Sequence, residues 1–213
     1  VDRLTPLRMQ GLLHSTIHIG NDLRLLSGRK RYPWERAGGQ TPMPAELREA
    51  MRSEAAIGAW NIAGAIYGSR ETVAATRKAV RRALKGYRVM FLNDRTLKLA
   101  GTVQRLLERV GLGRGLGEKL ESVRPIYGLL QGTPTDEPMR GAGWRVRGPL
   151  PAEPTDPLDC NAGLLWIAPI LPATGNDAEK VLQLVEPIYA KYGFDALVTF
   201  TLITERSLVC VTN

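Results

Sequence analysis

Two segments of the chain repeat one pattern, an apolar run followed by an amphipathic helix and a second apolar run. They cover residues 57–92 and 163–213 of the 213 residues. Runs of strand character that alternate with single helices favour an antiparallel sheet with its helices packed on one face. The pattern therefore predicts an α+β fold of the ferredoxin-like kind.

The first segment opens with an apolar, glycine-rich run that predicts a strand over 57–67. Ser69 is a suitable N-cap for the helix that follows. Apolar or small side chains then recur at three- and four-residue spacing, which is typical of one buried helix face. Gly86 is expected to end the helix, and YRVMFL, residues 87–92, predicts a second strand.

The second segment predicts a strand over Leu164–Leu171 and then a helix. Asn176 with Glu179 has the spacing of a capping box, and Gly193 is expected to end the helix. Pro187 lies inside the helix and is expected to kink it. Two further strands, ALVTFTLI and SLVCVTN, are joined by TERS, which is short enough for a hairpin turn.

The rest of the chain carries weaker signals. Residues 7–20 are expected to form a strand that carries His14 and His18 on one face. Residues 21–27, 44–55 and 97–111 predict helices. Residues 29–44 predict a loop.

Composition excludes some classes of protein. No apolar run approaches 18 residues, so the sequence predicts no membrane span. The two histidines offer no convincing metal site, because no carboxylate or cysteine lies at a useful offset. Cys160 and Cys210 form neither a CxxC motif nor a disulfide framework. The start without methionine and the strand-like last residues suggest a piece of a longer protein, a mature processed chain being the alternative.

Charge is unevenly distributed. Residues 151–213 carry three basic residues against eight acidic ones, and the preceding 150 residues carry 26 against 13. A basic region can indicate nucleic-acid binding. Here, however, the basic residues are scattered through helical stretches, and aromatic residues for base stacking are few. A solvated helix surface, or a face toward an acidic partner, explains the charge better.

One loop stands out chemically. GLLQGTPTDEPMRGAGWR, residues 128–145, is too rich in proline and glycine for a helix and too irregular for a strand. It carries the carboxylate pair Asp136–Glu137, which on composition alone favours a solvated turn. The other glycine-rich run, residues 111–120, follows a helix instead of a strand, so it indicates a helix end and not a dinucleotide-binding turn.

Three stretches carry a resemblance to a known family. They are GAWNIAGAIYGSRE at 58–71, LLQGTPTDEP at 129–138 and GLLWIAPILPATGNDA at 163–178. With their spacing, they resemble the substrate-binding cap domain of the vanillyl-alcohol oxidase and para-cresol methylhydroxylase (4-cresol dehydrogenase) family of FAD-linked oxidases. The resemblance covers nearly the whole chain.

The resemblance implies that residues 1–213 form a cap domain, with the FAD-binding domain outside this sequence. The family oxidises para-substituted phenols at the benzylic carbon, with hydride transfer to flavin. Its substrate is held as a phenolate by a Tyr-Arg pair that this sequence also lacks. This stretch alone is therefore expected to be inactive, because an unassisted phenol stays protonated at neutral pH.

The resemblance also assigns roles to single residues. Glu137 matches the family's active-site glutamate and would act as acid or base, or steer water. Positions that match the walls of the aromatic substrate pocket are Trp166, Ile170, Thr199, Leu208 and Cys210. For Trp166 and Leu208, ordinary core packing explains the residue equally well.

Departures from the family are informative. Leu164 occupies the flavin-contacting position at which the covalent oxidases have a histidine, and Gly141 and Gly143 lie where another member has a linking tyrosine. Leucine and glycine offer no nucleophile for a covalent bond, so the FAD is predicted to be non-covalent. Arg206 and Ser207 replace a histidine pair, which leaves the substrate open between a phenol and a hydroxy acid.

An alternative function is a ferredoxin-like interaction module whose basic half binds a protein or nucleic acid. Under the family hypothesis the partners are instead a phenolic small molecule, the FAD-binding domain of the same protein and a further copy in a homo-oligomer. Neither nucleic acid nor a membrane is expected. Oxygen and a cytochrome c remain alternative electron acceptors, and a bacterial cytoplasm or periplasm alternative locations.

Overall fold

The computed structural model describes residues 1–109, 124, 126–149 and 162–213. The chain divides into two compact units. The first contains Val1–Lys85 and Met139–Asn213, and the second contains Gly86–Pro138.

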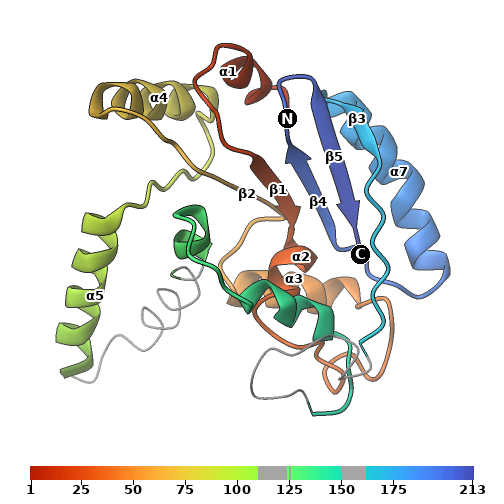
Figure 1. Ribbon diagram of the computed structural model, residues 1–213. Helices are drawn as coiled ribbons and strands as arrows, with labels where there is room; N and C mark the ends of the chain where they lie inside the picture. The colour runs from red at the N-terminus through yellow and green to blue at the C-terminus, as the bar shows by residue number, and fades with distance from the viewer. Residues whose placement is uncertain (110–123, 125, 150–161) are drawn as a thin grey trace. The chain divides into compact units, whose positions relative to one another are not determined.

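The first unit is built on a five-stranded sheet in the order β2-β1-β4-β5-β3 (Figure 1). Every neighbouring pair is antiparallel. The strands are β1 (Ile17–Asn21), β2 (Trp60–Gly64), β3 (Ile170–Pro172), β4 (Val198–Leu202) and β5 (Ser207–Thr212). The α+β class and the antiparallel sheet are as the sequence predicts.

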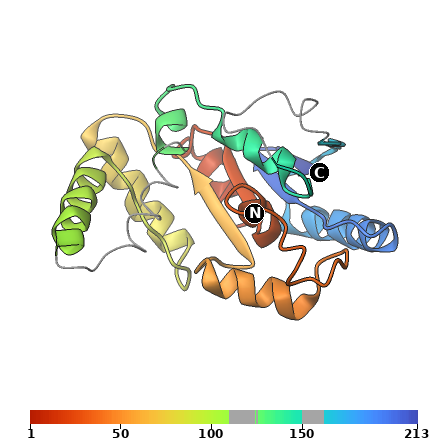
Figure 2. The ribbon, with the colours of Figure 1, turned by 90° about the horizontal axis from the view of Figure 1, so that it is seen from below.

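The helices of the first unit come from several parts of the chain. They are α1 (Thr5–Met9), α2 (Asp22–Ser27), α3 (Ala45–Glu54), α4 (Arg70–Ala83) and α7 (Gly175–Lys191). Helix α7 packs against β3 and β5, whereas α2 packs against β1 and β4. Seen from below, α7 lies at the β3–β5 end of the sheet, away from β2, which is the opposite edge strand (Figure 2).

The two central strands show why the sheet has one buried face. In β4, Val198, Phe200 and Leu202 are buried, and the residues between them are only partly covered. Strand β5 alternates in the same way. Since successive side chains of a strand point to opposite faces, one face is the core and the other is left open. Helix α7, which packs against β3 and β5, has Ala178 buried, and α4 has Thr76 and Val80 buried.

A second part of the core contains the tryptophan of the 128–145 stretch. Trp144 is buried among Leu23, Leu26, Met51 and Leu197. Its carbonyl oxygen also accepts a hydrogen bond from the backbone amide of Tyr32 at 2.8 Å, and the Tyr32 ring meets the Trp144 ring edge-on. The tryptophan therefore anchors the C-terminal end of this stretch into the first unit.

Asn21 connects β1, α2 and β4 through a single buried side chain. Its Oδ1 accepts hydrogen bonds from the backbone amides of Arg24, at 3.0 Å, and Val198, at 3.2 Å. Its Nδ2 donates to the carbonyl of Ala196 at 2.8 Å. The residue is thus the N-cap of α2 and also fixes the entry into the central strand β4.

Next to Asn21, a buried carboxylate ties α3 to the sheet. Asp22 is fully buried, and both of its oxygens accept hydrogen bonds from Arg48, at 2.5 to 3.1 Å. Arg52, one turn further along α3, lies 3.9 Å from Asp22. A buried charge needs such partners, so this ion pair holds α3 to the junction of β1 and α2.

Several predicted elements are confirmed. The side chain of Ser69 accepts a hydrogen bond from the amide of Thr72 and caps α4. Helices α2 and α3 occupy the two helical stretches predicted near the N-terminus. The strands β4 and β5 flank the TERS turn, and α7 ends before Gly193, whose φ of +71° is the left-handed conformation expected beyond a helix end.

Other predictions were wrong. The predicted strand over 7–20 is α1 followed by the short β1, and His14 precedes β1, so the two histidines do not share a strand face. The predicted strand over Leu164–Leu171 begins regular pairing only at Ile170, after an isolated bridge at Ile167. The cap of α7 is Thr174, which accepts from the amide of Asp177, and not Asn176.

The second unit contains α5 (Asp94–Arg109), which confirms the predicted helix. Residues 87–92 were predicted to be a strand but form none, and Tyr87, Met90 and Leu92 are exposed. A strand needs a neighbour for its backbone groups, and side-chain propensity alone does not supply one. The stretch 128–145 was expected to contain no helix, yet the 3-10 helix η1 (Glu137–Gly143) forms in it.

Among the described helices, none is long and apolar enough to cross a membrane. Residues 110–123, which include most of the glycine-rich run, and residues 150–161, which include Cys160, lie outside the described part of the chain.

The Asp22 ion pair gives a stability prediction. Asp22→Asn leaves Arg48 without its buried counter-charge, and we expect a loss of about 3 kcal/mol in the free energy of unfolding. Urea unfolding followed by circular dichroism measures the loss. The control is Glu54→Gln, which breaks the exposed pair between Glu54 and Arg36 and is expected to leave stability almost unchanged. Equal effects of the two substitutions would contradict the assignment.

Candidate functional site

The open face of the sheet brings together side chains from four strands. Strand registers place His18 beside Thr201, Thr201 beside Val209, and Val209 beside Ile170. Thr199 and Val211 form the next pair on the same face. This set, which we call the open face, mixes hydroxyl, imidazole and aliphatic groups at the centre of the sheet.

Ile170 and Trp166 extend the open face toward the sheet edge. Ile170 is 73% exposed and Trp166 is 66% exposed. The bridge between Ile167 and Thr212 keeps the register of β3 with β5, so Trp166 lies four positions before Ile170 on the same side of the strand. Of the predicted pocket residues, Trp166, Ile170 and Thr199 therefore belong to one face.

Leu208 and Cys210 lie on the opposite, helix-covered face. Both are 0% exposed, and their strand partners are Leu202 and Phe200. The structure therefore does not bring them together with Thr199, because each is next to an open-face residue of β5 and successive side chains of a strand point to opposite faces. Burial raises the pKa of the Cys210 thiol to about 11, which keeps it protonated at neutral pH.

The remaining predicted residues lie outside these strands. Leu164 precedes the bridge at Ile167 and is exposed. Glu137 is the first residue of η1, and its side chain lies outside the described part of the structure. Gly141, where a linking tyrosine was sought, sits within η1, and a side chain there would meet Ser27 of α2 at 3.7 Å.

The sequence prediction missed four residues of the open face, namely His18, Thr201, Val209 and Val211. His18 Nδ1 lies 3.1 Å from the hydroxyl oxygen of Thr201, within hydrogen-bond distance. Burial, and secondly the positive charge of Arg24, lower the pKa of His18, so its imidazole is neutral at pH 7. Val209 and Val211 flank Cys210 on the open side. The alternation of β5 was the signal that could have identified both valines.

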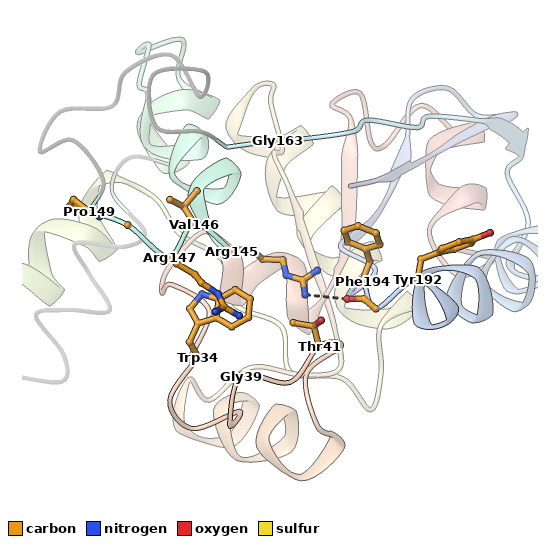
Figure 3. Close-up of a pocket in the computed structure, with 12 residues that line it drawn as sticks. Trp34, Gly39, Thr41, Arg145, Val146, Arg147, Pro149, Gly163, Tyr192 and Phe194 are labelled. Carbon is orange, nitrogen blue, oxygen red and sulfur yellow. Dashed lines mark hydrogen bonds between the residues drawn. The ribbon is translucent and has the colours of Figure 1, made fainter.

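A separate cleft of about 760 Å³ lies in the same unit, between the 145–149 segment and the loop after α7 (Figure 3). Arg145 donates a hydrogen bond to the carbonyl of Gly193 at 3.1 Å and lies over the rings of Tyr32, Trp34 and Phe194. Such cation–π contacts explain the two arginines of the cleft as packing groups, since Arg147 also lies 4.1 Å from the Trp34 ring centre.

In the described part of the chain, no cluster of three or more histidine, cysteine, aspartate or glutamate residues is arranged to hold a metal ion. The chemically distinctive surface is therefore the open face, which offers aromatic and aliphatic contacts together with a few polar groups. Such a combination is characteristic of sites for small organic ligands.

Sequence comparison gives relatives over nearly the whole chain, although no family model matches it. The 1'-carboxy-chondrochloren decarboxylase of Chondromyces crocatus is 32% identical over 208 residues, which are 96% of this chain and 38% of that protein. The 4-cresol dehydrogenase [hydroxylating] flavoprotein subunit of Pseudomonas putida is 25% identical over 94% of this chain and 32% of its own length. The chain thus spans about a third of each curated relative.

Solved structures agree with this relationship at the level of the fold. p-Cresol methylhydroxylase with substrate bound matches 99% of this chain and 34% of its own, with a TM-score of 0.71 at 20% identity. The 4-ethylphenol oxidase of Gulosibacter chungangensis, in an isoeugenol complex, matches 99% of this chain and 35% of its own, with a TM-score of 0.70 at 23% identity.

Fold and sequence together relate the chain to one part of FAD-linked flavoprotein enzymes. Its fold is that of the corresponding part of p-cresol methylhydroxylase and 4-ethylphenol oxidase, as expected for a cap domain of the vanillyl-alcohol oxidase and p-cresol methylhydroxylase type. The predicted resemblance is confirmed.

The buried position of Cys210 gives a second prediction. A thiol pKa of about 11 in place of the ordinary 9.0 lowers the thiolate fraction at pH 8 about 100-fold, and only the thiolate is alkylated. We expect iodoacetamide labelling of Cys210, followed by peptide mass spectrometry, to be at least that much slower in the native than in the urea-unfolded protein. Rapid native labelling would show that Cys210 lies on an accessible surface.

The raised pKa of Cys210 also predicts how its contribution to the stability of the fold depends on pH. The folded thiol holds its proton more tightly than the unfolded one, so its contribution to stability is complete below pH 9 and is lost as the pH rises toward 11.

Proposed function

We propose that this chain is the substrate-binding cap of an FAD-dependent oxidoreductase that oxidises para-substituted phenols at the benzylic carbon. The proposal rests on the combination of a sequence match and a surface of the sheet. The chain aligns along 94% of its length with a 4-cresol dehydrogenase flavoprotein subunit, and its sheet has an open face of aromatic, aliphatic and hydroxyl side chains.

The open face fits an aromatic cofactor and substrate chemically. Trp166 and Ile170 are both largely exposed, although large apolar side chains are usually covered in a complete protein. Flavin, when bound, would accept the hydride. The chain's own residues would exclude water from the reacting carbon and orient the phenol ring.

Within this proposal the residues have distinct roles. Trp166 and Ile170 form an apolar wall against the substrate ring, and Thr199 offers a hydroxyl at the sheet centre. Val209 and Val211 replace Leu208 and Cys210 as the aliphatic lining contributed by β5. Glu137 serves as the acid or base that moves a proton at the oxidised carbon or directs water to it.

The FAD of the full-length protein is proposed to be non-covalent and bound mainly by a separate FAD-binding domain. Leu164 would contact the flavin without bonding to it, because its side chain has no nucleophile. The electron acceptor in this proposal is either oxygen or a cytochrome c. The proposal also includes a homo-oligomeric full-length protein.

A second candidate function is decarboxylation of a carboxyl-bearing aromatic compound. It is favoured by the 32% identity with a protein named as a decarboxylase of a carboxylated compound. The same cap can serve both reactions, because each needs an aromatic substrate held against the open face. They differ in whether the site must also accept a carboxylate.

Flavin reduction tests the phenol reaction. We expect 4-ethylphenol to bleach the flavin absorbance of the full-length protein under anaerobic conditions in a stopped-flow experiment. Glu137→Gln removes the proton-transfer group and should slow turnover about 100-fold or more. The matched control is Asp136→Asn, at the neighbouring exposed carboxylate. Equal rates for Glu137→Gln and the wild type would remove Glu137 from the mechanism.

Acid precipitation tests the flavin linkage. Trichloroacetic acid added to the full-length protein should leave the yellow colour in the supernatant, since Leu164, Gly141 and Gly143 provide no atom for a covalent bond. A yellow pellet, with a flavinylated peptide found by mass spectrometry, would contradict the prediction.

A further inference from the structure

An arginine from outside the sheet lies across the open face. Gly20 pairs with Thr199 in the β1–β4 register, so a side chain at position 20 would share the face of Thr199. A Cβ at Gly20 would lie 3.6 Å from the Cγ of Arg24 and 3.2 Å from the Cδ1 of Leu25. The absent side chain of Gly20 therefore leaves the space through which the stem of Arg24 runs over the sheet.

Among the described residues, the Arg24 guanidinium has a hydrogen-bond partner but no counter-charge. Its Nη1 donates a hydrogen bond to Oδ1 of Asn213 at 2.8 Å. Among the residues that the structure describes, no carboxylate lies within ion-pair distance of it. The side chain is half-buried, and burial lowers the pKa of Arg24. A partly desolvated cation without a counter-charge is costly to keep, unless an anion completes it.

The surroundings of Arg24 suit the carboxylate of an aromatic acid. His18 lies close enough to feel the charge of Arg24 and keeps a neutral imidazole beside Thr201. Val211 pairs with Thr199 on the open face, and Asn213, two residues further on, directly follows the end of β5. Ile167 forms a bridge with Thr212, and Trp166 directly precedes it. The Trp166 ring therefore provides an aromatic wall at the same end of the sheet.

We propose that Arg24 binds the carboxylate of an aromatic acid on the open face and selects carboxyl-bearing substrates over neutral ones. Arginine suits this role, because its planar guanidinium can donate two parallel hydrogen bonds to a carboxylate. The proposal rests on the proposed function in taking the open face as the substrate wall. It adds to that function the class of substrate and the residue that recognises it.

Two probes of nearly the same shape test the charge preference. Isothermal titration calorimetry on the full-length protein compares 4-hydroxyphenylacetate with its neutral analogue 4-hydroxyphenylacetamide. We expect the acid to bind about tenfold tighter or more, as for a hydrogen-bonded charge pair. Arg24→Gln should remove this preference by raising the Kd of the acid. It should leave the Kd of the amide within about twofold.

Further variants separate recognition from folding. Arg24→Lys keeps the charge and should retain part of the preference. Gly20→Val leaves the arginine in the chain but fills the space beneath its stem, and should reduce the preference as Arg24→Gln does. Arg82→Gln removes an exposed charge from α4 and should change neither Kd.

Two results would overturn the proposal. One is that the wild-type protein binds the acid and the amide equally well. The other is that Arg24→Gln raises the Kd of both probes by the same factor. Calorimetry reads binding without turnover, so absence of flavin reduction by any phenol would defeat the proposed oxidation and leave the test of Arg24 intact.

Discussion

The buried amide of Asn21 is the interaction on which the rest of the first unit depends. It ends β1, caps α2 and bonds to both backbone groups at the entry of β4. A buried side-chain amide is stable only when its donors and acceptors are satisfied, so these three segments hold one another in a fixed relation. The start of α2 in turn positions Asp22 for α3 and Arg24 over the sheet.

This arrangement explains how one small sheet supports both a core and an open surface. The central strands β4 and β5 alternate strictly between buried and partly covered residues, so each core residue on one face is followed by a residue on the other face. Helices close the first face, and no described helix of the unit is needed to cover Trp166 or Ile170, which remain exposed. Under the proposed function, such a surface would enclose the substrate when the cap meets the cofactor-binding part of the protein.

Sequence reasoning succeeded where the signal is local. Ser69 caps α4 because the hydroxyl reaches an amide three residues on, and Gly193 follows α7 because glycine adopts a positive φ easily. It failed where pairing decides the structure. Residues 87–92 have strand propensity but no partner strand, and Leu208 and Cys210 were each assigned one position away from the open-face residues. Arg24 could not be found at all from its own segment, since Gly20 and Asn213 define its place.

Strand β3 has a consequence for the behaviour of the isolated polypeptide. It is an edge strand preceded by the apolar run LLWI, whose side chains are exposed, and an uncovered apolar edge is a template for aggregation. Pro169 and Pro172 interrupt this edge with residues that lack a backbone donor, which limits pairing with a second chain. The chain thus limits pairing along this edge as long as the edge is uncovered, and replacing either proline would weaken that protection.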